Sequence, residues 1–191
     1  MKYVISFLLL FYTIDATAQF NTNIYWTEQT NMASSDVIYF HSKTPLVWKD
    51  FKGTPVESSR AAAITASGFG YKADVKSIGS KGQLNVGVYC YFNKNNSWVK
   101  TGKNTVYILT HEQNHFNISF IAASLFVEKL KAASITNSNY SVLLPRIYKE
   151  SCDIMNKMQD DYDGQTKNGQ LKDMQAKWDE YLQKKISVLT N

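Results

Sequence analysis

Cysteine is scarce in this sequence, and it is never clustered. Cys90 and Cys152 are the only two cysteines among 191 residues, so there is no CxxC pair of the kind that holds structural zinc. We therefore expect no cysteine-ligated metal. In an oxidising compartment the two thiols can pair. We predict a Cys90–Cys152 bridge, with two free thiols as the alternative that their spacing leaves open.

No apolar run is long enough to cross a membrane, which takes about 20 residues. The longest, from Tyr3 to Ile14, follows Lys2 and ends shortly before Ala16-Thr17-Ala18. A positive start, a short apolar stretch and a small-x-small site are typical of a secretory signal peptide, here residues 1–18. We expect the mature chain to be exported to the periplasm or the extracellular space, without a membrane span.

The sequence also lacks a block of basic residues, an internal repeat and a low-complexity linker. Lysine and arginine number 21 against 16 aspartates and glutamates, a net charge of +5, and the basic residues are scattered. Nucleic-acid-binding proteins usually concentrate their positive charge, so we expect no nucleic-acid partner. The length of residues 19–191 fits a single domain with a substantial hydrophobic core.

The hydrophobic pattern changes once along the chain. Over residues 23–99, β-branched and aromatic residues alternate in part between Gly, Asn and Ser, which predicts three or four strands. After residue 104 the period is helical and predicts helices at about 105–132, 144–159 and 171–189. Strands followed by helices indicate an α+β fold, in which a small antiparallel sheet is covered on one face by about three helices.

The stretch ILTHEQNHFNISF, residues 108–120, contains an HExxH motif. Residues four apart lie on the same face of a helix, so His111 and His115 can hold one metal ion between them. Glu112 lies beside that pair, where its carboxylate can act as a general base. Neutral imidazoles are good zinc ligands, and zinc activates water for hydrolysis. The motif therefore predicts a Zn2+ site with two histidine ligands and a catalytic glutamate.

The surroundings of the motif support this interpretation. Apolar residues lie on most sides of it, which predicts a buried helix: Val106, Ile108, Leu109, Phe116, Ile118, Phe120 and Ile121. A buried polar group without a partner costs roughly 1–3 kcal/mol, and a metal ion supplies such a partner to each histidine. The alternative is a hydrogen-bonded pair of core histidines, and we favour the metal site.

Five further stretches of the sequence match motifs of a known protein family. They are LVWKDFKGTP (46–55), AAAITASGFGY (61–71), YFNKNNSWV (91–99), YDGQT (162–166) and QAKW (175–178). Together with LTHEQNHFNI, they make the sequence resemble the predicted secreted zinc-dependent proteases of bacteria, a family long described as a domain of unknown function. The resemblance covers most of the mature chain. It implies an exported zinc-dependent peptidase with His111 and His115 as ligands and Glu112 as catalytic base.

One position departs from that family. Its members read Tyr-Asp-x-x-Thr-x-His, whereas this chain has Tyr162, Asp163 and Thr166 followed by Asn168. If the histidine completes the metal site in relatives, Asn168 replaces it poorly, because a neutral amide oxygen binds zinc weakly. The departure motivates a second hypothesis, a non-catalytic exported module that binds zinc or a partner and keeps the protease fold.

Catalytic zinc usually has three protein ligands, and we predict Asp163 as the third. If the second helix runs antiparallel to the first, its end returns toward His111, and Asp163 also matches the acidic position of the family. Glu150 is the alternative, but it lies near the start of that helix, roughly 15 Å from the metal at about 1.5 Å per residue. Glu128 faces away from the histidine pair. His41 is expected to be a turn residue.

Tyr162 is a candidate donor to the oxyanion that forms during hydrolysis, with a packed aromatic ring as the alternative. Thr65 and Ser97 are expected to be structural, and the aromatic residues Trp48, Phe51, Trp98 and Trp178 to pack in the core. The sequence as a whole predicts an exported metallopeptidase that hydrolyses peptide bonds in a peptide or protein substrate.

Overall fold

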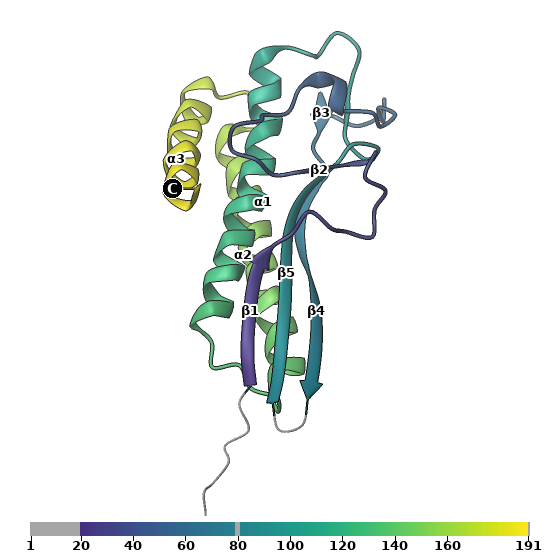
Figure 1. Ribbon diagram of the computed structural model, residues 1–191. Coiled ribbons are helices and arrows are strands. Elements are labelled where there is room, and N and C mark those ends of the chain that lie inside the picture. Colours follow the sequence, from purple (N-terminus) through teal and green to yellow (C-terminus); the bar gives the residue numbers. More distant parts are fainter. Residues whose placement is uncertain (1–19, 79–80, 191) are drawn as a thin grey trace, which may run out of the picture.

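The computed structural model describes residues 20–78 and 81–190, and its strands precede its three long helices (Figure 1). The strands are β1 (Phe20–Trp26), β2 (Val37–Tyr39), β3 (Ala63–Ile64), β4 (Ser67–Ile78), β5 (Lys81–Asn93) and β6 (Trp98–Val99), and a 3-10 helix covers Trp48–Asp50. The helices are α1 (Val106–Ala132), α2 (Tyr140–Thr166) and α3 (Lys172–Thr190). The predicted α+β fold is confirmed. The predicted signal peptide, residues 1–18, lies outside the described residues.

The main sheet is mixed, not antiparallel as predicted. β5 lies at its centre and pairs antiparallel with β4 on one side. β5 also pairs in parallel with β1 through its residues 82–88, and antiparallel with β2 through its residues 91–93. A parallel pair needs a long connection between its strands, and residues 27–80 provide one. β3 and β6 form a separate two-stranded sheet beside the N-terminal half of α1.

The inner face of the sheet packs on α1 to form the core. Alternate residues of β5 point to this face and are almost fully buried: Leu84, Val86, Val88, Cys90 and Phe92. α1 contributes Phe116, Phe120, Ala123 and Phe126 to the same cluster. α1 thus runs along the sheet, as predicted, while α3 lies on the opposite side of α1 (Figure 1).

α2 is longer than its sequence predicts. The polar stretch after Gln159 has the composition of a turn, yet the helix continues to Thr166. Tyr162 and Thr166 lie one turn apart and are fully buried, which keeps this last segment packed as a helix. The helix then ends in three consecutive residues with positive φ, Lys167, Asn168 and Gly169.

The predicted Cys90–Cys152 bridge is wrong, because both cysteines are free thiols. Cys90 faces the core from β5, and burial raises the pKa of its thiol well above the usual value. It therefore packs as a small apolar side chain. Cys152 lies on α2 and is half-buried.

No helix within the described residues is both long enough and apolar enough to cross a membrane.

Candidate metal centre

The two histidines of the HExxH motif and the predicted third ligand meet between α1 and α2. His111 and His115 lie one turn apart in the first half of α1, which Thr105 caps by accepting a hydrogen bond from the Ile108 N–H. Asp163 belongs to the last turn of α2. The sequence had predicted that this helix ends near residue 159, which would have left Asp163 in the connecting segment. The antiparallel run of α2 nevertheless brings its carboxylate to the histidine pair.

Three potential ligand atoms form a nearly equilateral triangle. Asp163 Oδ1 lies 3.2 Å from His111 Nε2 and 3.2 Å from His115 Nε2. The two Nε2 atoms lie 3.3 Å from each other. Tetrahedral zinc with bonds of about 2.0–2.1 Å requires ligand atoms roughly 3.3–3.4 Å apart. The spacing of the three atoms is close to that value, and together the three side chains could hold a metal ion.

Gln175 of α3 determines which nitrogen of the neutral His111 imidazole carries the proton. The Gln175 amide donates from Nε2 to the carbonyl of Tyr107 at 3.4 Å, which turns its Oε1 toward His111 Nδ1, 3.2 Å away. An amide oxygen only accepts, so Nδ1 must carry the proton. In the neutral imidazole, the lone pair then lies on Nε2, the atom that points into the triangle.

Gln159 of α2 does the same for His115. Its Nε2 donates to the backbone carbonyl of His115 at 2.9 Å, and its Oε1 lies 2.5 Å from His115 Nδ1. Nδ1 is again the protonated nitrogen, and Nε2 again offers its lone pair. Hydrogen bonds that fix the tautomer and the ring orientation in this way are typical of the surroundings of metal-bound histidines.

The electrostatics of the triangle favour a cation at its centre. Asp163 Oδ1 is buried and receives no hydrogen bond unless an imidazole is protonated at Nε2. Burial acts to raise the pKa of Asp163, but the two imidazoles outweigh it and lower that pKa far below its usual value. Burial acts to lower the pKa of His115, but Asp163 and Glu112 outweigh it and raise that pKa. One proton satisfies part of this site, whereas a divalent ion satisfies all three atoms at once.

Glu112 is a buried carboxylate beside the triangle. Only 4% of its surface is exposed, and its Oε2 has no hydrogen-bond partner within the described residues. Burial raises the pKa of Glu112, and the charges of the two histidines and the Thr65 hydroxyl act against that rise. Thr65 also donates to the Glu112 backbone carbonyl at 3.1 Å. A carboxylate with a raised pKa is suited to accept a proton and to return it.

Tyr162 does not fit the oxyanion role that the sequence allowed. Its ring is fully buried and stacks on the ring of His111, with centroids 4.7 Å apart. Its hydroxyl accepts from Asn114 Nδ2 at 3.2 Å and donates to the His111 carbonyl at 3.5 Å. A buried hydroxyl with both bonds used within the core has none to offer a substrate. Tyr162 is the packed aromatic residue of the alternative hypothesis.

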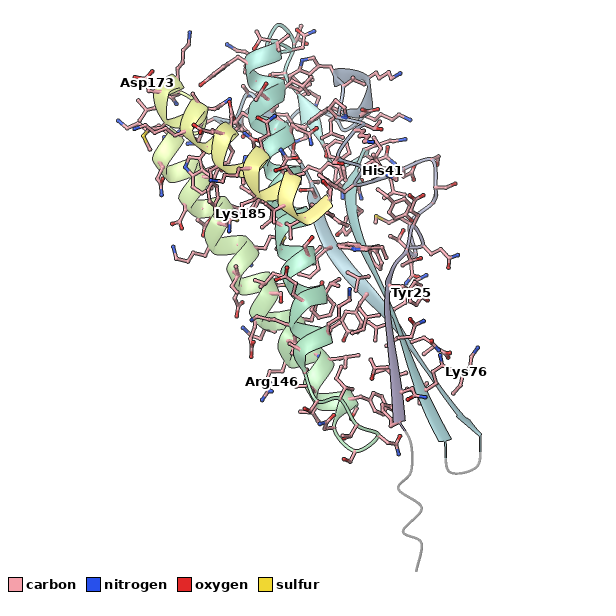
Figure 2. The ribbon with its side chains drawn as sticks, turned by 60° about the vertical axis from the view of Figure 1, so that its left-hand side comes forward. Tyr25, His41, Lys76, Arg146, Asp173 and Lys185 are labelled. Carbon is pink, nitrogen blue, oxygen red and sulfur yellow. The ribbon has the colours of Figure 1, made fainter. Side chains whose placement is uncertain are left out.

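The other candidate ligands lie elsewhere. Glu150 is an exposed residue that pairs with Lys129 at 3.1 Å. His41 pairs with Glu28 at 2.9 Å, and it lines a pocket with Leu189 and Thr190 at the end of α3 (Figure 2). Asn168 is exposed in the left-handed turn that follows α2.

Sequence reasoning missed the side chains that surround the ligands. Besides Gln159 and Gln175, these are Asn114 on α1 and Asp179 on α3, joined by a hydrogen bond of 2.5 Å. A partial signal was present, because Gln159 lies four residues before Asp163 and so shares its helix face. Gln175 and Asp179 come from a helix that is distant in the sequence, and nothing local predicts their contact with α1.

Comparison with known protein families, with curated proteins and with solved structures finds no match to this chain. The chemical role of the centre is therefore inferred from its geometry and from the residues that form it.

Proposed function

We propose that this protein is an exported zinc-dependent peptidase with its metal held by His111, His115 and Asp163. One observation carries the proposal. Two Nε2 lone pairs and a carboxylate oxygen converge at mutual distances of 3.2–3.3 Å, while both Nδ1 atoms face glutamine oxygens. Three protein ligands with a further position left for water are typical of catalytic zinc.

Each residue then has a defined part in peptide hydrolysis. Bound zinc supplies a Lewis acid that lowers the pKa of water and polarises the scissile carbonyl. Glu112 accepts the proton of the attacking water and passes it to the leaving amine. The raised pKa of Glu112 supports that second transfer, because it brings the carboxyl group closer to the working pH. Gln159 and Gln175 hold the imidazoles in the ligand tautomer.

We propose zinc rather than another divalent metal because of the ligand types, the spacing of the ligand atoms and the neighbouring glutamate taken together. Two imidazoles and one carboxylate also suit iron(II). The triangle edges match tetrahedral zinc, and the HExxH arrangement places a glutamate next to the first ligand, as hydrolysis requires. The resemblance of the motifs to secreted zinc-dependent proteases supports a peptide or protein substrate.

Asn168 motivates the second candidate, a non-catalytic zinc-binding module. The geometry does not favour this candidate, because His111, His115 and Asp163 could provide three ligands without a contribution from position 168. The expected histidine of the family is thus not needed to complete a catalytic set.

Metal analysis combined with a cleavage assay tests the proposal. We expect about one zinc per chain after purification, and cleavage of a peptide library that stops when a chelator removes the metal. Glu112→Gln is expected to keep the zinc and to lower the cleavage rate roughly 100-fold or more, since it removes the base and leaves the ligands intact. Zinc without cleavage by the wild type would favour the non-catalytic module. Iron in place of zinc, or full activity of Glu112→Gln, would contradict the proposed chemistry.

A further inference from the structure

β1 and β4, the two longer strands that pair with β5, differ in how their free edges are protected. β4 carries the charged residues Lys72, Asp74 and Lys76 at alternate positions. Its Phe69 carbonyl also accepts a hydrogen bond of 3.0 Å from the hydroxyl of Tyr148, on α2. Charged side chains and a covering helix discourage strands of other molecules from pairing with a sheet edge.

β1 has no charged side chain of its own, and Lys131 at the end of α1 is the charged residue that lines the groove beside it. The sequence of β1, FNTNIYW, contains no charged residue and no proline. Within residues 20–78 and 81–190, its only strand partner is β5. Tyr25 and Trp26 are 47% and 46% exposed, and Figure 2 places Tyr25 on the side away from α2 and α3.

The free edge of β1 borders an open groove. The groove has a volume of about 320 Å3 and is lined by residues 22–24 of β1 and by Leu130, Lys131 and Ala133 at the end of α1. The Thr27 N–H donates to the Val88 carbonyl at 2.8 Å, so the backbone of Thr27 faces β5. Backbone direction alternates along a strand, which leaves the N–H and C=O groups of Thr22, Ile24 and Trp26 facing outward.

We propose that β1 of a second copy of this chain pairs antiparallel with this edge, which makes the protein a two-fold symmetric dimer. The strand is complementary to itself, because its own side chains carry no charge that would repel the same strand of the copy. The register with the longest overlap places Asn23 opposite Asn23 of the copy, and an amide can both donate and accept. It also places Phe20 opposite Trp26, an aromatic pair of the kind that stabilises antiparallel strands. This interface goes beyond the proposed peptidase activity and does not depend on it.

Sedimentation equilibrium over a concentration series tests the dimer. Thr22→Pro removes an N–H that faces outward and leaves the hydrogen bonds between β1 and β5 in place. We expect the wild type to dimerise and Thr22→Pro to raise the dissociation constant at least about ten-fold. Thr22→Val is the matched control, since it keeps the N–H and the β-branched shape, and it is expected to dimerise like the wild type.

A charge pair at the two-fold axis tests the register and remains decisive if Thr22→Pro fails to fold. Asn23→Lys and Asn23→Asp each place like charges opposite one another, so each variant alone is expected to be monomeric. An equal mixture of the two is expected to recover the dimer as a heterodimer, with unchanged circular dichroism throughout. A wild type that is monomeric at every concentration, or a dimer indifferent to both Asn23 variants, would overturn the proposal.

Discussion

Two glutamines orient the imidazoles of the candidate metal centre. Gln175 and Gln159 each use the amide N–H group on a backbone carbonyl and present the oxygen to an imidazole. Gln175→Leu removes the acceptor for His111 Nδ1 while keeping much of the volume, and we expect zinc affinity to fall roughly 10–100-fold. Gln175→Glu keeps an acceptor and is expected to bind zinc at least as tightly as the wild type. Gln183→Leu, on an exposed glutamine of α3, serves as the control. Equal zinc affinities of Gln175→Leu and the wild type in chelator competition would show that this contact is only packing.

At the scale of elements, the turn between α2 and α3 affects both the stability of the fold and the candidate metal centre. Gly169 has φ of +76°, and a Cβ there would lie 3.2 Å from both His111 Nδ1 and Gln175 Oε1. Gly102 has φ of +75° with open space around it, so it provides a matched comparison. Each substitution to alanine is expected to cost about 1–2 kcal/mol of unfolding free energy, because the left-handed conformation disfavours a side chain. Only Gly169→Ala is expected to weaken zinc binding as well. Denaturant unfolding and zinc titration of both variants separate these effects, and equal zinc affinities would contradict the role of this turn.

The elements also show how far local patterns reach. The strand and helix periods predicted the α+β fold and three helices, and the spacing of His111 and His115 predicted that they share one helix face. Asp163 was predicted from an antiparallel return of α2, which the structure contains. The parallel pairing of β1 with β5 could not be predicted, because it joins residues about 60 positions apart. The contacts of Gln175 with His111 and Tyr107 could not be predicted for the same reason. Local periodicity specifies elements, while long-range packing selects their partners.

At the scale of the whole molecule, packing and not a covalent bridge ties the sheet to the helices. Cys90 is 3% exposed, and burial raises the pKa of both thiols. A thiol reacts as its thiolate, so we expect a disulfide reagent to leave Cys90 unmodified in the folded protein and to react slowly with Cys152. Two thiols are expected after unfolding without reductant. Finding none in the unfolded, unreduced protein would mean that the sheet and α2 are cross-linked after all.

The central claim is that His111, His115 and Asp163 bind one zinc ion. Zinc affinity, measured by competition with a chelator in the wild type, Asp163→Ala and Glu150→Ala, tests it most directly. Both substitutions remove a carboxylate from α2, but only Asp163 lies 3.2 Å from both imidazoles, whereas Glu150 pairs with Lys129. We predict that Asp163→Ala weakens zinc binding roughly 100-fold or more, because two imidazoles alone leave the ion undercoordinated, and that Glu150→Ala binds like the wild type. Wild-type affinity in Asp163→Ala, or loss of zinc in Glu150→Ala, would contradict the assigned site.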